Sequence, residues 1–132
     1  MTSLVDAESV LAIDIGSLNT RALLFDVVDG QYHFIAASTA STTAGAPFND
    51  VSEGVHNAIL RLQEITGRAL AGSDTRLIIP TQGDGSGVDR LALTCSAGMN
   101  VKVLAMGLLN EASLQSVLRL AGTSYTQVVE RI

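Results

Sequence analysis

Three strand-like segments follow one another near the start of this 132-residue chain, and they constrain its fold more than any other feature. Val10–Ile15 is a β-branched and aliphatic run that ends at Gly16, as a buried strand does when it breaks at a turn. Arg21–Val28 and Gln31–Ser38 are two further runs, joined by Asp29-Gly30, whose residues both tolerate the positive φ of a tight hairpin. The pattern predicts a three-stranded antiparallel meander.

The period of the apolar residues then changes from that of a strand to that of a helix. It predicts an amphipathic helix over about residues 51–67, with Asp50 and Glu53 as a capping box at its start. The small and polar residues between Thr39 and Phe48 are interpreted as a flexible loop. The glycine-rich segment 70–89 is expected to be loop with one brief element inside.

The last third of the chain predicts more strands and a second helix. The strands are expected over residues 90–95, 101–107 and 125–132, and the helix is capped by Asn110 and ends at Gly122. Strands followed by a helix and then by alternating strands and helices indicate an α/β fold with helices packed on a mixed sheet. This order is that of a ribonuclease-H-like core.

Composition narrows the class of protein. Apolar residues make up 47% of the chain and charged residues 16%, so it can bury a sizeable core. Only 8 basic residues oppose 13 acidic ones, which leaves no basic patch for nucleic acid or an anionic membrane surface. The apolar runs are too short to cross a bilayer, and the lone Cys95 cannot form an internal disulfide. A cytoplasmic location is expected.

The segment from Asp14 to Arg21 carries the most chemistry. A carboxylate at the end of a buried strand costs desolvation unless a donor or a metal-bound water pairs with it. Gly16 allows the following turn to approach an oxyanion closely, and Ser17, Asn19 and Thr20 supply hydroxyl, amide and backbone donors. Concave turns of this kind bind phosphate, and Arg21 could add a fixed charge at the rim. The alternatives are a turn-capping carboxylate, ordinary turn chemistry and a solvated arginine.

Asp14-Ile-Gly-Ser-Leu-Asn-Thr-Arg21 resembles the first phosphate loop of the actin-like ATPase superfamily, which includes sugar kinases, actin and the heat-shock chaperone ATPases. Within that superfamily the chain is most similar to the MutL-like proteins encoded beside adenosylcobalamin-dependent glutamate mutase, which are unrelated to mismatch-repair MutL. Two later segments carry this narrower resemblance: Gly87-Val-Asp89 leading into Leu93-Thr-Cys-Ser-Ala-Gly98, and Lys102-Val-Leu-Ala-Met-Gly-Leu108 before an alanine-containing helix.

The resemblance implies a nucleotide site and its ligands. It places Asp14 near magnesium and implies ATP as the nucleotide. The cofactor-binding residues expected from the turn and from the second block are Asp14, Gly16, Ser17, Asn19, Thr20, Arg21, Ser96 and Gly98. No residue is assigned as catalytic, because no carboxylate or glutamine at the end of the strand over residues 90–95 could orient an attacking water.

Two other segments invite a site but favour simpler interpretations. Cys95 and Ser96 could be nucleophiles, yet neither His33 nor His56 is an evident general base, so Cys95 is expected to be a buried core thiol. Residues 83–87 are rich in glycine but lack the lysine and hydroxyl of a P-loop and the ligand count of a calcium loop. They are interpreted as a surface loop.

The sequence therefore predicts the N-terminal lobe of a longer actin-like protein, with residues 1–132 as a single lobe. By the resemblance, the full-length protein would bind ATP and magnesium, could be an ATPase, and could serve as a chaperone or reactivation factor for a cobalamin-dependent mutase. The lobe alone is expected to be inactive and to self-associate as a homodimer. The alternatives are a non-catalytic scaffold or interaction domain and the lobe of a sugar or acyl kinase.

Overall fold

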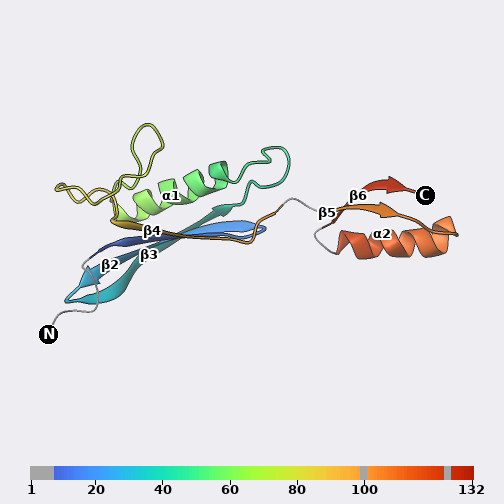
Figure 1. The fold of residues 1–132 in the computed structure, drawn as a ribbon, viewed down its shortest axis with the longest axis horizontal. Helices are drawn as coiled ribbons and strands as arrows, with labels where there is room; N and C mark the ends of the chain where they lie inside the picture. The colour runs from blue at the N-terminus through green and yellow to red at the C-terminus, as the bar shows by residue number, and fades with distance from the viewer. Residues whose placement is uncertain (1–7, 99–100, 124–125) are drawn as a thin grey trace. The chain divides into compact units, whose positions relative to one another are not determined.

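The computed structural model describes residues 8–98, 101–123 and 126–132 (Figure 1). The chain divides into two compact units, Met1–Ala97 and Gly98–Ile132. Within the described residues, no helix is both long enough and apolar enough to cross a membrane.

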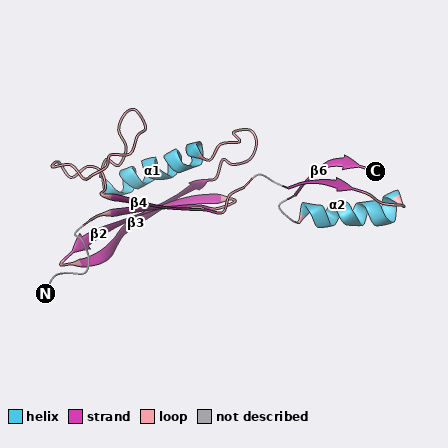
Figure 2. Ribbon diagram, in the orientation of Figure 1, coloured by secondary structure: helices cyan, strands magenta, loops and turns pink. Residues whose placement is uncertain are grey.

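The first unit is built on a four-stranded mixed sheet with the strand order β3-β2-β1-β4. Figure 2 shows strands of this sheet in magenta and the helix α1 (Ser52–Thr66) in cyan. The strands are β1 (Val10–Ile15), β2 (Asn19–Val28), β3 (Gln31–Ser41) and β4 (Arg90–Cys95). β1 pairs antiparallel with β2, and β2 pairs antiparallel with β3, which confirms the predicted meander. β4 pairs parallel with β1 on its other side, so the sheet is mixed as predicted.

The helix α1 (Ser52–Thr66) packs on one face of this sheet, against β2 and β3. It confirms the helix predicted over residues 51–67. Alternate residues of β1, β2 and β3 lie on the face that α1 covers and form the core together with residues of α1 and of the connection after it: Leu11, Ile13, Ile15, Ala22, Leu24, Ala40, Ala58, Ile59, Leu62, Leu70 and Val88. On the same face of β4, Leu91 and Leu93 stay 44% and 58% exposed.

The segment interpreted as a flexible loop is instead ordered by tertiary contacts. β3 continues to Ser41, and the buried Thr43 accepts a hydrogen bond of 2.9 Å from the Gly54 N–H in the first turn of α1. The predicted capping box is wrong, because Val51 is the N-cap and Asp50 lies one residue before it. The Asp50 carboxylate therefore accepts from the N–H and hydroxyl of Ser52.

The glycine-rich connection between α1 and β4 contains one brief paired element, as predicted. It is an isolated antiparallel bridge between Ala71 and Leu77. The Gln63 side chain accepts hydrogen bonds from the N–H groups of Leu70 and Ala71, which holds the chain against the end of α1. Leu70 and Val88 are fully buried, so the connection is anchored to the core at both ends.

The second unit is a strand, a helix and a strand, with β5 (Val101–Ala105) parallel to β6 (Thr126–Arg131). A π-helical turn, η1 (Asn110–Leu114), leads into α2 (Gln115–Gly122). The elements were predicted, but Asn110 does not cap the helix: the N-cap is Leu109, whose N–H donates to the Ser113 hydroxyl. Tyr125, the first residue of the predicted last strand, lies outside the described residues.

Candidate functional site

Four polar residues lie side by side across the face of the sheet opposite α1. In strand order they are Thr39, Arg21, Asp14 and Thr94, each a register partner of the next. All four are exposed. Asp14 alternates along β1 with the buried Ile13 and Ile15, and this alternation points its side chain away from the core. These four residues are called the polar row below.

The polar row differs from the adjacent row on the same face. Two positions toward the start of β1, the register partners are Ala37, Leu23, Ala12 and Ala92. This second row carries no charge and no hydroxyl group. Charge on this part of the face is therefore concentrated at the end of β1 that enters the turn at Gly16.

Asp14 and Arg21 present opposite charges within the polar row. The Asp14 Oδ1 atom accepts a hydrogen bond of 2.8 Å from the Thr94 hydroxyl. Its Oδ2 atom has no hydrogen-bond partner among the described residues, and neither does the Arg21 guanidinium. One carboxylate oxygen and one cation are thus free to meet a ligand from solvent.

The turn between β1 and β2 closes through its own backbone. The Gly16 N–H donates to the Asn19 carbonyl at 2.9 Å, and a Cβ at position 16 would lie 2.8 Å from that oxygen. Only glycine fits there without a shift of the backbone. Ser17, Leu18 and Asn19 are exposed, and the N–H groups of Ser17 and Leu18 have no protein partner among the described residues.

A threonine from the end of β3 supports this turn from inside the fold. The Thr42 hydroxyl donates to the Gly16 carbonyl at 2.7 Å, and the Thr42 N–H donates to the Leu18 carbonyl at 2.8 Å. Thr20 is fully buried, and its hydroxyl lies 2.9 Å from that of Thr42. Thr20 therefore supports the turn and offers no group to a ligand, in contrast to its expected role. Thr42 was missed because it lies in the stretch interpreted as loop.

The end of β4 comes next to the same turn. The N–H groups of Ser96 and Ala97 both donate to the Ile15 carbonyl, at 2.9 and 3.1 Å, which places Ser96 beside Gly16. These two amides are occupied, so Ser96 can offer its exposed hydroxyl but not its N–H. Gly98 belongs to the second unit, whereas the other expected binding residues belong to the first.

Cys95 is exposed, so its interpretation as a buried core thiol is wrong. Cys95 lies on the same face of β4 as Leu91 and Leu93, and this is the face of the sheet on which α1 packs. Because α1 contacts β2 and β3, it leaves these side chains of β4 uncovered. Its Sγ atom lies 3.6 Å from the Ala97 carbonyl.

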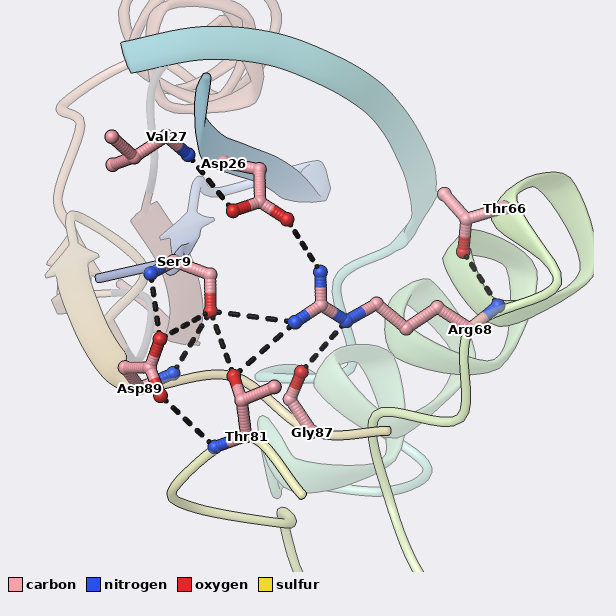
Figure 3. Close-up of polar contacts among 8 residues, drawn as sticks. All are labelled: Ser9, Asp26, Val27, Thr66, Arg68, Thr81, Gly87 and Asp89. Atoms are coloured by element: carbon pink, nitrogen blue, oxygen red, sulfur yellow. Dashed lines mark hydrogen bonds and ion pairs between the residues drawn. The ribbon is translucent and has the colours of Figure 1, made fainter. Parts of the chain in front are cut away.

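A second polar cluster lies at the opposite ends of β1 and β4 (Figure 3). Asp89 accepts hydrogen bonds from the N–H groups of Ser9 and Thr81, at 2.8 and 3.0 Å, and these bonds lower the pKa of its carboxyl to about 2. Arg68 bonds the Gly87 carbonyl at 2.8 Å and pairs with Asp26 at 2.9 Å. The Ser9 hydroxyl bonds both Thr81 and Asp89. The polar groups of these residues bond one another, so the cluster has a structural role.

Metal-binding capacity at the polar row is limited to one carboxylate. Among the described residues, no group of three or more His, Cys, Asp or Glu side chains could hold a metal ion. Magnesium is commonly held by one or two carboxylates together with substrate phosphates and water. The single Asp14 carboxylate, with its free Oδ2, fits a magnesium ion that arrives with a phosphate ligand and does not fit a metal bound by protein alone.

The family described as MutL protein matches residues 10–132, nearly the whole chain. The chain belongs to the MutL protein family. Comparison of this MutL-family chain with the curated proteins gives no match.

Two solved structures similar to the MutL-family chain are proteins of Aquifex aeolicus. One is the PPX-GPPA enzyme, at 19% identity and a TM-score of 0.35, with 94% of this chain and 35% of that chain covered. Another is the Ppx/GppA family member, at 15% identity and a TM-score of 0.34, with 94% and 34% covered. The chain thus spans about a third of the length of these proteins.

Proposed function

We propose that this MutL-family chain is the nucleotide-binding lobe of a longer actin-like protein with a ribonuclease-H-like core, and that it holds the phosphates of ATP together with magnesium. The observation that supports it is the presence at one end of β1 of three groups that have no hydrogen-bond partner among the described residues: the Asp14 Oδ2 atom, the Arg21 guanidinium, and the N–H groups of Ser17 and Leu18. The mixed sheet, with its antiparallel β1-β2-β3 meander and parallel β4, agrees with the arrangement that the sequence predicts for such a core.

Each of these groups has a defined task in the proposal. The two turn amides point dipoles at a phosphate, as backbone nests do. Arg21 adds a fixed positive charge that suits a phosphate oxygen in a bidentate geometry. Asp14 faces the cation, and the Ser17 and Ser96 hydroxyls and the Asn19 amide border the phosphate. Magnesium, when bound, would neutralise the phosphate charge that the one arginine leaves uncompensated.

The test is ATP titration by calorimetry on the full-length natural protein, in magnesium and in EDTA. Wild-type protein should bind more tightly in magnesium. Asp14→Asn keeps the shape of the side chain but removes its charge, so affinity should fall in magnesium and change little in EDTA. Equal loss in both conditions would show that Asp14 is a structural turn residue, and absence of binding would favour a scaffold or interaction domain.

The partner proposed for this nucleotide-binding protein is an adenosylcobalamin-dependent mutase, for which it would act as a chaperone or reactivation factor. This part rests on membership of the MutL protein family and on the resemblance carried by residues 87–108. Closure of two lobes over the phosphates would couple nucleotide state to the partner. Recovery of activity by a cobalamin-inactivated mutase, measured with ATP and with no nucleotide, tests it. A sugar or acyl kinase would instead transfer phosphate to its own substrate.

A further inference from the structure

The hydrogen bond between Thr94 and Asp14 joins two strands that are distant in the sequence. The Thr94 hydroxyl lies 2.8 Å from the Asp14 Oδ1 atom, and the two residues are register partners on β4 and β1. An ionised carboxylate only accepts hydrogen bonds, so the threonine is the donor. The Thr94 hydroxyl donates its proton to the Oδ1 atom of Asp14, and the Oδ2 atom accepts no hydrogen bond from the described residues.

We propose that Thr94 is a positioning residue for the cation held by Asp14. This inference rests on the proposed function and extends it to a residue of β4. The charge-assisted bond to Oδ1 fixes the rotation of the carboxylate, so that Oδ2 is the oxygen presented to the cation. Threonine suits this task because its branched Cβ restricts the side chain to few rotamers on a strand.

Among the described residues, the Thr94 hydroxyl bonds only the Asp14 side chain, and β4 is held on β1 by backbone pairing as well. Thr94 is exposed, and the pairing of β4 with β1 runs through the backbone from Arg90 to Cys95. Thr94 makes no other side-chain hydrogen bond within the described part of the chain. Loss of the hydroxyl therefore leaves the strand in place and frees the carboxylate of Asp14 to rotate.

The experiment compares Thr94→Val, which keeps the shape and removes the hydroxyl, with Thr94→Ser, which keeps the hydroxyl. ATP affinity of the full-length protein is measured by calorimetry in magnesium and in EDTA. Groups that hydrogen-bond a metal ligand typically contribute about 10–100-fold to metal affinity. Because both residues are exposed, we expect the low end: Thr94→Val loses about tenfold in magnesium and nothing in EDTA, and Thr94→Ser stays near wild type.

Thr39→Val is the matched control, since Thr39 is the exposed threonine at the other end of the polar row, two strands from Asp14. It should change affinity in neither condition. Unchanged thermal unfolding of Thr94→Val would establish that the variant folds. Three results would overturn the proposal: full magnesium-dependent affinity in Thr94→Val, equal loss in magnesium and EDTA, or no rescue by serine. If Thr94→Val keeps full magnesium-dependent affinity while Asp14→Asn loses it, the role of Thr94 is contradicted but the proposed nucleotide site is not. If the wild-type protein shows no magnesium-dependent binding, both proposals are contradicted.

Discussion

The Oδ2 atom of Asp89 accepts hydrogen bonds from both the N–H and the hydroxyl of Ser9, a residue 80 positions earlier in the chain, at 2.8 and 3.0 Å. This pair joins the beginnings of β1 and β4. It also ties the long connection after α1 to the sheet, because Asp89 accepts a further bond from the Thr81 N–H. The bonds require the ionised carboxylate, and this requirement makes the stability of the first unit depend on pH.

Asp89→Asn should destabilise the first unit at neutral pH and remove a pH dependence that the wild type shows. The folded-state pKa of Asp89 lies at about 2, below the ordinary value of 3.8. A lowered folded pKa gives stability that is complete above the ordinary value and is lost as pH falls toward about 2. After allowance for solvent screening, we expect Asp89→Asn to lower the free energy of unfolding at neutral pH by about 1 kcal/mol.

Urea unfolding of wild type and Asp89→Asn between pH 2 and pH 7 measures this effect. The difference between the two proteins should be constant above about pH 5 and shrink as pH falls from 3.8 toward 2. A difference that stays the same at all pH values would mean that the ionisation of Asp89 contributes nothing.

Gly54→Ala should be destabilising, although alanine is the better helix former by about 1 kcal/mol. A Cβ at position 54 would lie 2.7 Å from the Ser41 carbonyl and 3.3 Å from the Thr42 Cα, both backbone atoms. Because backbone cannot move aside cheaply, we expect a net loss of about 1–2 kcal/mol in thermal unfolding. Gly122→Ala is the control: nothing lies within 4 Å of the place its methyl group would take, so it should be neutral or stabilising.

Thr42→Val should loosen the turn that the proposed phosphate site uses. The variant removes the bond to the Gly16 carbonyl and leaves the buried Thr20 hydroxyl without its partner. A buried polar group left unsatisfied costs about 1–3 kcal/mol, and we expect a lower unfolding midpoint accordingly. Thr39→Val, at an exposed position nearby, should stay within about 0.5 kcal/mol of wild type. Equal stability of the two variants would contradict the supporting role of Thr42.

Residues 1–132 alone should show no measurable ATPase activity. Their affinity for ATP should be millimolar at best, which corresponds to a binding free energy of about −4 kcal/mol. The reason is that the proposed site offers one phosphate turn and one arginine, whereas the actin-like ATPases that the sequence resembles hold nucleotide between two lobes. Calorimetry and a phosphate-release assay on this chain check the prediction. Micromolar binding would contradict the single-lobe interpretation.

Residues 1–132 alone should also self-associate as concentration rises. In the helical part of the second unit Leu114 is buried, but Leu120 of α2 is 70% exposed and Val117 is 38% exposed. Leu120→Lys should therefore weaken a homodimer formed through this helix. Sedimentation velocity over a concentration series decides it: a wild type that stays monomeric, or a dimer unaffected by the lysine, would contradict the prediction.

Local sequence patterns predicted most of the elements but not the contacts that organise them. β1 and β4 match their predicted bounds, because each is a short apolar run ended by polar or glycine residues. The roles of Thr42 and Thr43 could not be predicted, since their hydroxyls bond residues of the turn and of α1 that only the tertiary fold brings near. The exposure of Cys95 follows from which strands α1 contacts, and a strand pattern carries no such information.

The candidate site was predictable in part for the same reason. Asp14, Gly16 and Ser17 lie within one short segment, so the sequence shows them together. Thr94 follows Asp14 by 80 residues, and only the parallel register of β4 on β1 makes them neighbours.

The central position of β1, with an antiparallel neighbour on one side and a parallel one on the other, has a consequence for the order of folding. Pairing of β1 with β2 closes a loop of a few residues, whereas pairing with β4 closes one of 80. Each doubling of loop length costs about 0.6 kcal/mol of chain entropy, so the second closure costs about 2 kcal/mol more than the first. We expect β1, β2 and β3 to be largely formed in the transition state and β4 to dock after it. Mutations in β4 should then speed unfolding while leaving the folding rate nearly unchanged.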